Sequence, residues 1–337
     1  MFYLHLIHYI GFFGAQTFNS ILALLIIKRA GRLFGAYRHV MLFFTLCSMW
    51  FSWVEILTQP VMHMKGSMFA VFIDNVDFPP ELGELILCLH CASFAFLISV
   101  FAAQFFYRYC ALCKLSIMNL LTGYRIYLIF LPCFMVYFFW FKVSEWGTMS
   151  TSEKREYLKD DLEVMFDRDS KSIPFVAVLY WTIGPDGRKI WRFKDLLSAG
   201  MYVFIINTVS SMILFFALKI YFHMRTACTH MSQKTLDLNR QLFIMLTVQT
   251  IVPFVLMYIP IGLVIGLPFF NLNLGEFVNL ASASIAIYPM IEPLIAMFCI
   301  TDFRWTVFQI LGIQKYSARV YTISDGTNAA TQPSRAY

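Results

Sequence analysis

Long apolar stretches separated by shorter polar segments run through the whole chain. Seven of them are about 20 residues or longer, the length at which an α-helix crosses the roughly 30 Å hydrocarbon core of a bilayer. They lie at about residues 5–27, 39–61, 85–109, 124–144, 197–222, 241–267 and 277–301. No repeat relates one half of the chain to the other, which argues against an inverted-repeat transporter. The pattern predicts an all-α membrane protein built as a seven-transmembrane helix bundle.

The composition supports this interpretation. Of the 337 residues, 59% are hydrophobic and only 14% are charged, and the mean hydropathy is +0.66. Soluble domains carry about 25% charged residues. The high hydropathy of a chain of this length therefore excludes a cytosolic enzyme and a nucleic-acid-binding domain as first interpretations. The net charge of +6 does not by itself indicate an acidic partner, because the basic residues lie between apolar stretches and form no single patch.

The distribution of Lys and Arg predicts the side of the membrane on which each loop lies. Most of the basic residues outside the long loop 142–196 fall in the segments 28–38, 108–125, 219–240 and 302–337, whereas the short loops between the other spans contain only Lys65. Loops rich in Lys and Arg stay in the cytoplasm. We therefore expect an extracellular N-terminus, with the first span an uncleaved signal anchor, and a cytoplasmic C-terminus.

The long extracellular loop 142–196 has a pattern of its own. Ser150–Glu153 is a helix-capping box followed by apolar residues at helical spacing. Two aromatic-rich strands around a Gly-Pro turn, Phe175–Trp181 and Lys189–Phe193, predict a hairpin. This helix and hairpin either cover the mouth of the bundle or only protect the ends of the helices.

Two further segments follow the last span. Residues 302–316 are expected to form an amphipathic helix on the inner membrane surface, and residues 317–337 a disordered cytoplasmic tail. On the same side lie Cys110, Cys113 and Cys228, which are either palmitoylated or inert thiols.

Ionisable residues inside the spans are the main sign of function, since each is costly in a bilayer unless it is paired. Glu55 and Gln59 continue a polar stripe on the second span, and His90 and Arg108 share one face of the third. Glu55 and His90 are level in the outer third of the bundle. They are expected to form a pair that either contacts a ligand or only joins two helices.

Glu292 on the seventh span lies about seven residues, or roughly 10 Å, deeper than Glu55. With no basic residue at its depth, it is expected to be protonated or bonded to a hydroxyl or backbone group, with a packing or switch role. The sixth span contains Pro253, Pro260 and Pro268, which predict a kink that is either a moving part or a bend that opens a cavity.

Catalytic, metal-binding and nucleotide-binding motifs are absent from the sequence, so neither an enzyme activity nor a cofactor or metal is expected. In the outer halves of the spans, aromatic side chains accompany the polar pair. The candidate ligand-binding residues are Glu55, Gln59, His90, Phe94, Phe101, Tyr202 and Tyr258, with Phe204 as a further aromatic residue. They predict a small, uncharged or weakly polar ligand.

Several motifs resemble one family, the nematode seven-transmembrane chemoreceptors of the str type, called serpentine receptor class r. They are Glu55-Ile-Leu-Thr-Gln-Pro-Val-Met-His63, Tyr107-Arg-Tyr109, Gln241-Leu-Phe with Pro253 and Tyr258-Ile-Pro260, and Tyr288-Pro-Met-Ile-Glu-Pro-Leu-Ile295 followed by Asp302-Phe-Arg304. The resemblance covers about residues 1–315. One departure is Glu292, where members of the family usually have Asp.

The resemblance implies an olfactory receptor for a small odorant that couples to a heterotrimeric G protein in the plasma membrane of chemosensory cilia. Tyr107-Arg108-Tyr109 is similar to the Asp-Arg-Tyr motif of rhodopsin-like receptors, with Tyr in place of the acid. The candidate coupling and switch residues are Tyr107, Arg108, Tyr109, Pro253, Tyr288, Pro289, Glu292, Asp302 and Arg304.

Two other classes stay open. An odorant-gated cation channel also uses seven spans, but channels of that kind have a cytoplasmic N-terminus. A transporter or scaffold is the third possibility, and it lacks support from any repeat or charged translocation path.

Overall fold

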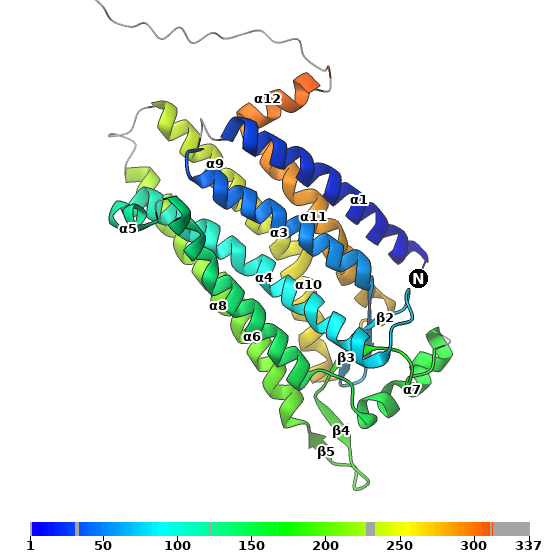
Figure 1. Ribbon diagram of the computed structural model, residues 1–337. Helices are drawn as coiled ribbons and strands as arrows, with labels where there is room; N and C mark the ends of the chain where they lie inside the picture. Colours follow the sequence, from blue (N-terminus) through cyan, green and yellow to red (C-terminus); the bar gives the residue numbers. More distant parts are fainter. Residues whose placement is uncertain are drawn as a thin grey trace, which may run out of the picture.

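The computed structural model describes residues 2–30, 34–121, 123–166, 168–226, 233–310 and 312. The expected tail 317–337, the last part of the expected surface helix 302–316 and Cys228 lie outside the described residues. The described part is a bundle of long helices with a small sheet at one end and the short helix α12 (Thr301–Ile310) at the other (Figure 1). These two ends are called the sheet end and the α12 end below.

Seven helical segments of the described chain are long and apolar enough to cross a membrane, in agreement with the seven expected spans. They comprise α1 (Phe2–Leu25) with the π-turn η1 (Ile26–Ala30), α3 (Tyr37–Thr58), α4 (Pro80–Cys113), η2 (Gly123–Phe130) with α6 (Leu131–Gly147), α8 (Phe193–Thr226), α9 (Gln233–Pro253) with η4 (Phe254–Tyr258), α10 (Ile259–Gly266) and η5 (Leu267–Phe270), and η6 (Gly275–Val278) with α11 (Asn279–Cys299). The short helix α5 (Leu115–Leu120) follows α4 at the α12 end.

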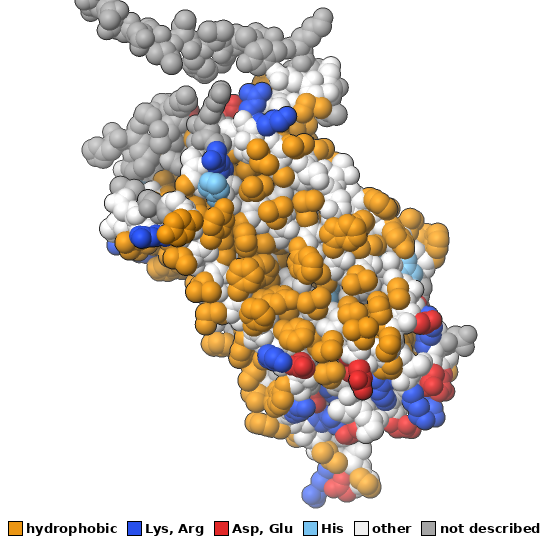
Figure 2. Space-filling model, in the orientation of Figure 1, with side chains coloured by type: hydrophobic (Ala, Val, Ile, Leu, Met, Phe, Trp, Pro, Cys, Tyr) orange, Lys and Arg blue, Asp and Glu red, His pale blue; other side chains and the backbone are white. Residues whose placement is uncertain are grey.

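Helix α4 crosses the middle of the bundle and packs against α3, α6 and α8. In its most apolar window 78% of the residues are buried, compared with 28% in α8. Apolar side chains cover the middle of the face shown in Figure 2, and charged side chains gather toward its two ends. This band is the surface expected of a bundle whose sides face lipid.

The second span ends earlier than the predicted boundary of residue 61. Helix α3 stops at Thr58 because Gln59 adopts a left-handed backbone conformation with φ of 36°, and its N–H bonds to the Glu55 carbonyl. Pro60 then begins strand β1 (Pro60–Lys65), which turns at Gly66 and Ser67 into strand β2 (Met68–Ile73). Gly66, with φ of 54°, supplies the positive φ that a two-residue hairpin turn requires.

The hairpin predicted for the long loop is only partly correct. Strand β4 (Trp181–Ile183) pairs with β5 (Lys189–Trp191), but β3 (Phe175–Leu179) pairs with β2 and completes a sheet in the order β1-β2-β3. Strand β2 is therefore the central strand, and both of its edges are paired. All six of its residues are buried. In the described residues the strands are confined to the loops between the spans.

The predicted capping box is also wrong in its register. Helix α7 (Ser152–Phe166) is capped by Thr151, whose hydroxyl accepts a hydrogen bond from the Lys154 N–H at 3.3 Å. Ser150 and Glu153 are used elsewhere: Ser150 Oγ donates to Glu84, and Glu153 pairs with Arg192. Leu158 and Leu162 of α7 are buried against the outer side of the sheet.

Prolines in the spans leave backbone carbonyls without their usual partners, and neighbouring helices supply replacements. Pro293 has no N–H for the Pro289 carbonyl, and Asn19 Nδ2 on α1 donates to that carbonyl at 2.9 Å. Pro260 likewise has none for the Leu256 carbonyl, to which Ser284 Oγ on α11 donates. In the sixth span, where a kink is predicted, the α-helical pattern gives way to the π-helix η4 directly after Pro253.

Replacing Asn19 by Ala is expected to lower the free energy of unfolding by about 1 kcal/mol, because the Pro289 carbonyl then lies unpaired in an apolar environment. The midpoint of thermal unfolding of the purified protein measures this loss. Asn207→Ala is the matched control, since Asn207 Nδ2 bonds only within its own helix on an exposed face. Equal effects of the two replacements would contradict the assignment.

Candidate functional site

A cavity lies at the sheet end between the helices and the sheet. Its walls include Met62, Phe69 and Val71 from the sheet and His90, Phe94, Trp140 and Tyr202 from the helices. The space open to the centre of a water molecule is about 80 Å³. One water needs roughly 10–15 Å³ measured in this way, so the cavity has room for a ligand of a few heavy atoms.

The strands of the two loops form the cover of this cavity. Val176, Ala177 and Val178 of β3 contribute to its lining, together with residues of β1 and β2. Helix α7 lies on the far side of the sheet (Figure 1). Of the two interpretations of the long loop, the structure therefore favours a cover over the mouth of the bundle, although the sheet rather than the predicted hairpin provides it.

Glu55 and His90 form the expected pair. His90 Nε2 lies 2.6 Å from Glu55 Oε2, and both side chains are buried. His90 borders the cavity, whereas Glu55, also a candidate ligand residue, is not part of its lining. A second imidazole, His8 of α1, lies with Nδ1 3.5 Å from the other carboxylate oxygen, Oε1. Sequence reasoning missed His8, although its place in the outer part of the first span is at the depth of Glu55.

The other candidate ligand residues divide into two groups. Phe94 and Tyr202 line the cavity, and Tyr202 is held by a 2.8 Å hydrogen bond to Ser144 and by stacking on Trp140. Gln59, Phe101 and Tyr258 are buried outside the lining. Gln59 accepts a hydrogen bond from His5 at 2.7 Å and so joins α3 to α1, while Phe101 packs against Phe44 and Tyr288.

Phe204 was expected among the aromatic residues of the ligand site, and this is wrong. Its side chain is 71% exposed on the outer face of α8, where it would face lipid. Apolar spans carry aromatic residues all round, so composition alone could not separate the two faces of α8.

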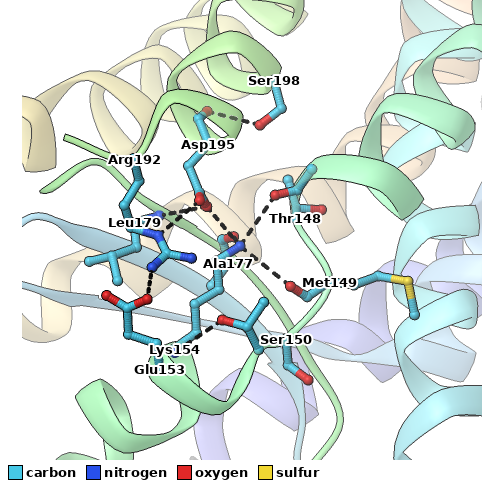
Figure 3. A network of polar contacts seen from close by, with 12 residues as sticks. Thr148, Met149, Ser150, Glu153, Lys154, Ala177, Leu179, Arg192, Asp195 and Ser198 are labelled. Atoms are coloured by element: carbon cyan, nitrogen blue, oxygen red, sulfur yellow. Dashed lines mark hydrogen bonds and ion pairs between the residues drawn. The ribbon is translucent and has the colours of Figure 1, made fainter.

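A buried ion pair holds β3 in place over the cavity (Figure 3). Lys154 Nζ of α7 lies 2.7 Å from Asp195 Oδ1 and donates to the Ala177 carbonyl at 2.7 Å, and the Leu179 N–H donates to the same Asp195 oxygen at 3.1 Å. Both charged side chains are almost completely buried. The strand is therefore tied on both sides of Val178, whose side chain borders the cavity.

The ion pair of Lys154 and Asp195 is extended by Arg192. Arg192 Nε donates to Asp195 Oδ2 at 3.1 Å, and Arg192 also pairs with Glu153. Burial lowers the pKa of Lys154, and the Asp195 carboxylate opposes that shift only in part. The ammonium group therefore depends on its bonds to Asp195 and to the backbone carbonyls around it.

At the α12 end, Arg108 contacts two other helices. Its Nη2 donates to Asn239 Oδ1 of α9 at 2.7 Å, and its guanidinium carbon lies 5.1 Å from the centre of the Tyr37 ring. Tyr37 stacks on Tyr107 at 5.4 Å between ring centres. The neutral amide of Asn239 thus joins α4 to α9 through Arg108.

The remaining candidate switch residues lie along α4, α9, α11 and α12. Tyr109 packs on Phe216, Tyr288 is fully buried, Pro253 ends α9, and Pro289 is the residue whose carbonyl Asn19 binds. In α12, Asp302 is exposed and Arg304 half-buried, whereas Phe303 between them is buried in the bundle.

Glu292 does not have the partner that was expected. Gln249 Nε2 of α9 donates to Glu292 Oε1 at 2.5 Å, so a side-chain amide rather than a hydroxyl or backbone group binds the carboxyl group. Gln249 and Glu292 lie 43 residues apart on two different helices, so no local sequence pattern identified them as partners.

Seven apolar helices around a covered cavity define a multi-pass membrane protein of the seven-transmembrane receptor type. A sequence model of the family described as "Serpentine type 7TM GPCR chemoreceptor Str" matches residues 4–308. The chain belongs to this family, as the motif resemblance predicted. It is a family of chemoreceptors and not of enzymes.

Individual relatives agree with this assignment. Serpentine receptor class r-10 of Caenorhabditis elegans is 28% identical over 302 residues, which is 88% of each chain. Its Caenorhabditis briggsae counterpart of the same name is 28% identical over 301 residues, or 88% of this chain and 87% of the relative. G-protein coupled receptor str-33 of Caenorhabditis elegans is 28% identical over 302 residues, or 87% and 86%.

Lys154→Met is expected to loosen β3, because removing one member of a buried ion pair costs about 3 kcal/mol and leaves Asp195 without its main partner. Amide hydrogen exchange in residues 175–179 should then accelerate by about a hundredfold through local opening. Lys159→Met, an exposed lysine of the same helix, is the control and should leave the exchange unchanged. Unchanged exchange in both variants would count against the clamp.

Proposed function

We propose that this protein is a chemosensory receptor in which a small, weakly polar ligand binds in the cavity under the sheet and activates a heterotrimeric G protein at the α12 end. The observation that carries the proposal is the cavity itself. It is apolar, covered by the sheet, and borders on His90, which is hydrogen-bonded to Glu55.

The size and lining of the cavity support a ligand of a few heavy atoms. Such a pocket favours an apolar compound oriented by few polar groups. A multiply charged ligand would have to lose its hydration without finding matching counter-charges, since Glu55 is hydrogen-bonded to His90. We infer that the natural ligand is an uncharged odorant, and that the receptor acts in the plasma membrane of sensory cilia.

The proposed orientation places the sheet end outside the cell and the α12 end in the cytoplasm. The concentration of Lys and Arg in the loops between α1 and α3 and after α4, α8 and α11 supports it. A ligand would then arrive from outside at the cover, and the G protein would meet the end at which Arg108 lies.

One experiment tests the ligand proposal. Cells expressing the receptor are screened by calcium or G-protein readout against small ketones, esters, aldehydes and alcohols and against a panel of peptides. We expect responses to small neutral compounds that are lost in Cys91→Trp, which fills the cavity, and kept in Leu214→Trp, which adds the same bulk on the exposed face of α8. Responses to peptides or charged metabolites alone would contradict the proposal.

An epitope tag at the N-terminus separates this function from the channel alternative. A receptor of the proposed orientation is stained on intact cells, whereas the odorant-gated channel with its cytoplasmic N-terminus is stained only after permeabilisation. A ligand-evoked current that persists when G-protein signalling is blocked would favour the channel.

Glu55 and His90 are expected to act as one unit in ligand recognition. Glu55→Gln and His90→Phe should each weaken ligand potency by about tenfold, and the double variant should lose less than the product of the two effects. Dose–response curves at equal surface expression measure this. Strictly multiplicative losses would show that the two residues act separately, and reduced folding yield with unchanged potency would show a structural pair.

Arg108→Ala is expected to abolish G-protein signalling while surface expression and ligand affinity stay nearly unchanged, because Arg108 lies at the α12 end, far from the cavity. Asn239→Asp is the matched variant. It makes the contact with Arg108 a charged hydrogen bond, which should strengthen it and lower ligand-independent signalling. Loss of ligand binding in step with loss of signalling in Arg108→Ala would contradict this role.

A further inference from the structure

A second, much smaller cavity lies deeper in the bundle, between α1, α3, α4, α9 and α11. The space open to the centre of a water molecule is about 10 Å³, close to the minimum that one water requires. Most of its lining is apolar, but three amide- or carboxyl-bearing side chains take part: Gln104 of α4, Gln249 of α9 and Glu292 of α11. Each is at most 2% exposed.

Each of these three side chains has one bonded and one unbonded polar atom. Gln104 Oε1 accepts a hydrogen bond from the Tyr37 hydroxyl at 3.3 Å, and Gln249 Nε2 donates to Glu292 Oε1 at 2.5 Å. Gln104 Nε2, Gln249 Oε1 and Glu292 Oε2 are then left buried without a partner in the described part of the chain.

Three unpaired polar atoms beside one water-sized space are a costly arrangement if the space is empty, since each buried unsatisfied group costs about 1–3 kcal/mol. We propose that a single water molecule occupies this cavity and joins Gln104, Gln249 and Glu292 into one junction. The water accepts from Gln104 Nε2 and donates to Gln249 Oε1 and Glu292 Oε2, which is the usual complement of about three bonds for a buried water.

The chemistry of the lining favours water over a metal cation. A water can both donate and accept, so it serves the site whether Glu292 is ionised or protonated. A cation requires oxygen ligands on all sides. The amide oxygen of Gln104 is already bonded to Tyr37, and the atom of Gln104 without a partner is the amide nitrogen Nε2, which cannot bind a cation. The cavity also contains a single carboxyl group in its lining.

The junction has a mechanical consequence. Gln104 lies one helical turn from Arg108, which binds Asn239 of α9, so α4 is connected to the proline-broken helix α9 at two levels. The contact nearer the α12 end, between Arg108 and Asn239, is direct. The contact nearer the sheet end, between Gln104 and Gln249, runs through water. A bridging water can rearrange its bonds as helices shift, which a direct packing contact cannot do.

Direct observation is the first test. A high-resolution cryo-EM or crystal structure of the full chain should show a density peak within hydrogen-bond distance of Gln104 Nε2, Gln249 Oε1 and Glu292 Oε2. An empty cavity, or a peak ringed by five or more oxygen ligands at shorter, metal-like distances, would overturn the proposal.

Thermal unfolding of the purified receptor provides the second test. In a double-mutant cycle, Gln104→Leu and Gln249→Leu should couple, and the lowering of Tm in the double variant should fall short of the sum of the two by about 2 °C. The side chains share no direct bond, and the bridging water is expected to couple them. The control pair is Gln104→Leu with Ser284→Ala, and its effects should be additive. Ser284 lies elsewhere on α11, and its hydroxyl donates to the Leu256 carbonyl of η4. Additivity in both pairs would overturn the bridge.

Sodium dependence separates water from a cation. The Tm of the wild type should be the same in sodium chloride and in choline chloride at equal ionic strength. A rise of Tm in sodium that disappears in Glu292→Gln would overturn the water assignment in favour of a monovalent cation. Glu292→Gln keeps the shape of the side chain, so this comparison does not depend on a variant that fails to fold.

Discussion

Backbone N–H and C=O groups find no water inside a bilayer, and the structure depends on satisfying them from within. Regular helices do this by themselves over most of the seven spans. The prolines of the sixth and seventh spans break the pattern, and the replacements come from other helices, as Asn19 binds the Pro289 carbonyl and Ser284 the Leu256 carbonyl. These two carbonyls are therefore satisfied only in the assembled bundle, and the two bonds position α1 and η4 against α11.

The same constraint explains why polar side chains in the bundle occur in groups. Glu55 lies between His90 and His8, Gln249 binds Glu292, and Arg108 binds Asn239. Each group joins at least two helices, and together they follow the bundle from the covered cavity to the α12 end. A change at the cavity that moves His90 therefore acts on a helix, α4, that also carries Gln104 and Arg108.

The sheet end follows a different principle, because water is available there and a buried charge is the costly element. Lys154 and Asp195 are nearly inaccessible, and the bonds to the Ala177 carbonyl and the Leu179 N–H make their burial tolerable. Such a pair contributes little net stability compared with apolar packing, but it is strict about geometry. The ion pair fixes the position of β3, and β3 forms one wall of the cavity.

Local sequence patterns were sufficient to predict the seven spans, the loop helix α7 and the pairing of Glu55 with His90. Hydropathy and helical periodicity are local properties of the chain, and depth in the bilayer follows from counting residues. Four features became apparent only in the folded structure: β3 pairs with β2, His8 lies beside Glu55, Gln249 binds Glu292, and Phe204 faces outward. Each of these depends on how distant segments rotate and pack against one another, and an apolar helix with aromatic residues all round carries no local signal of that rotation.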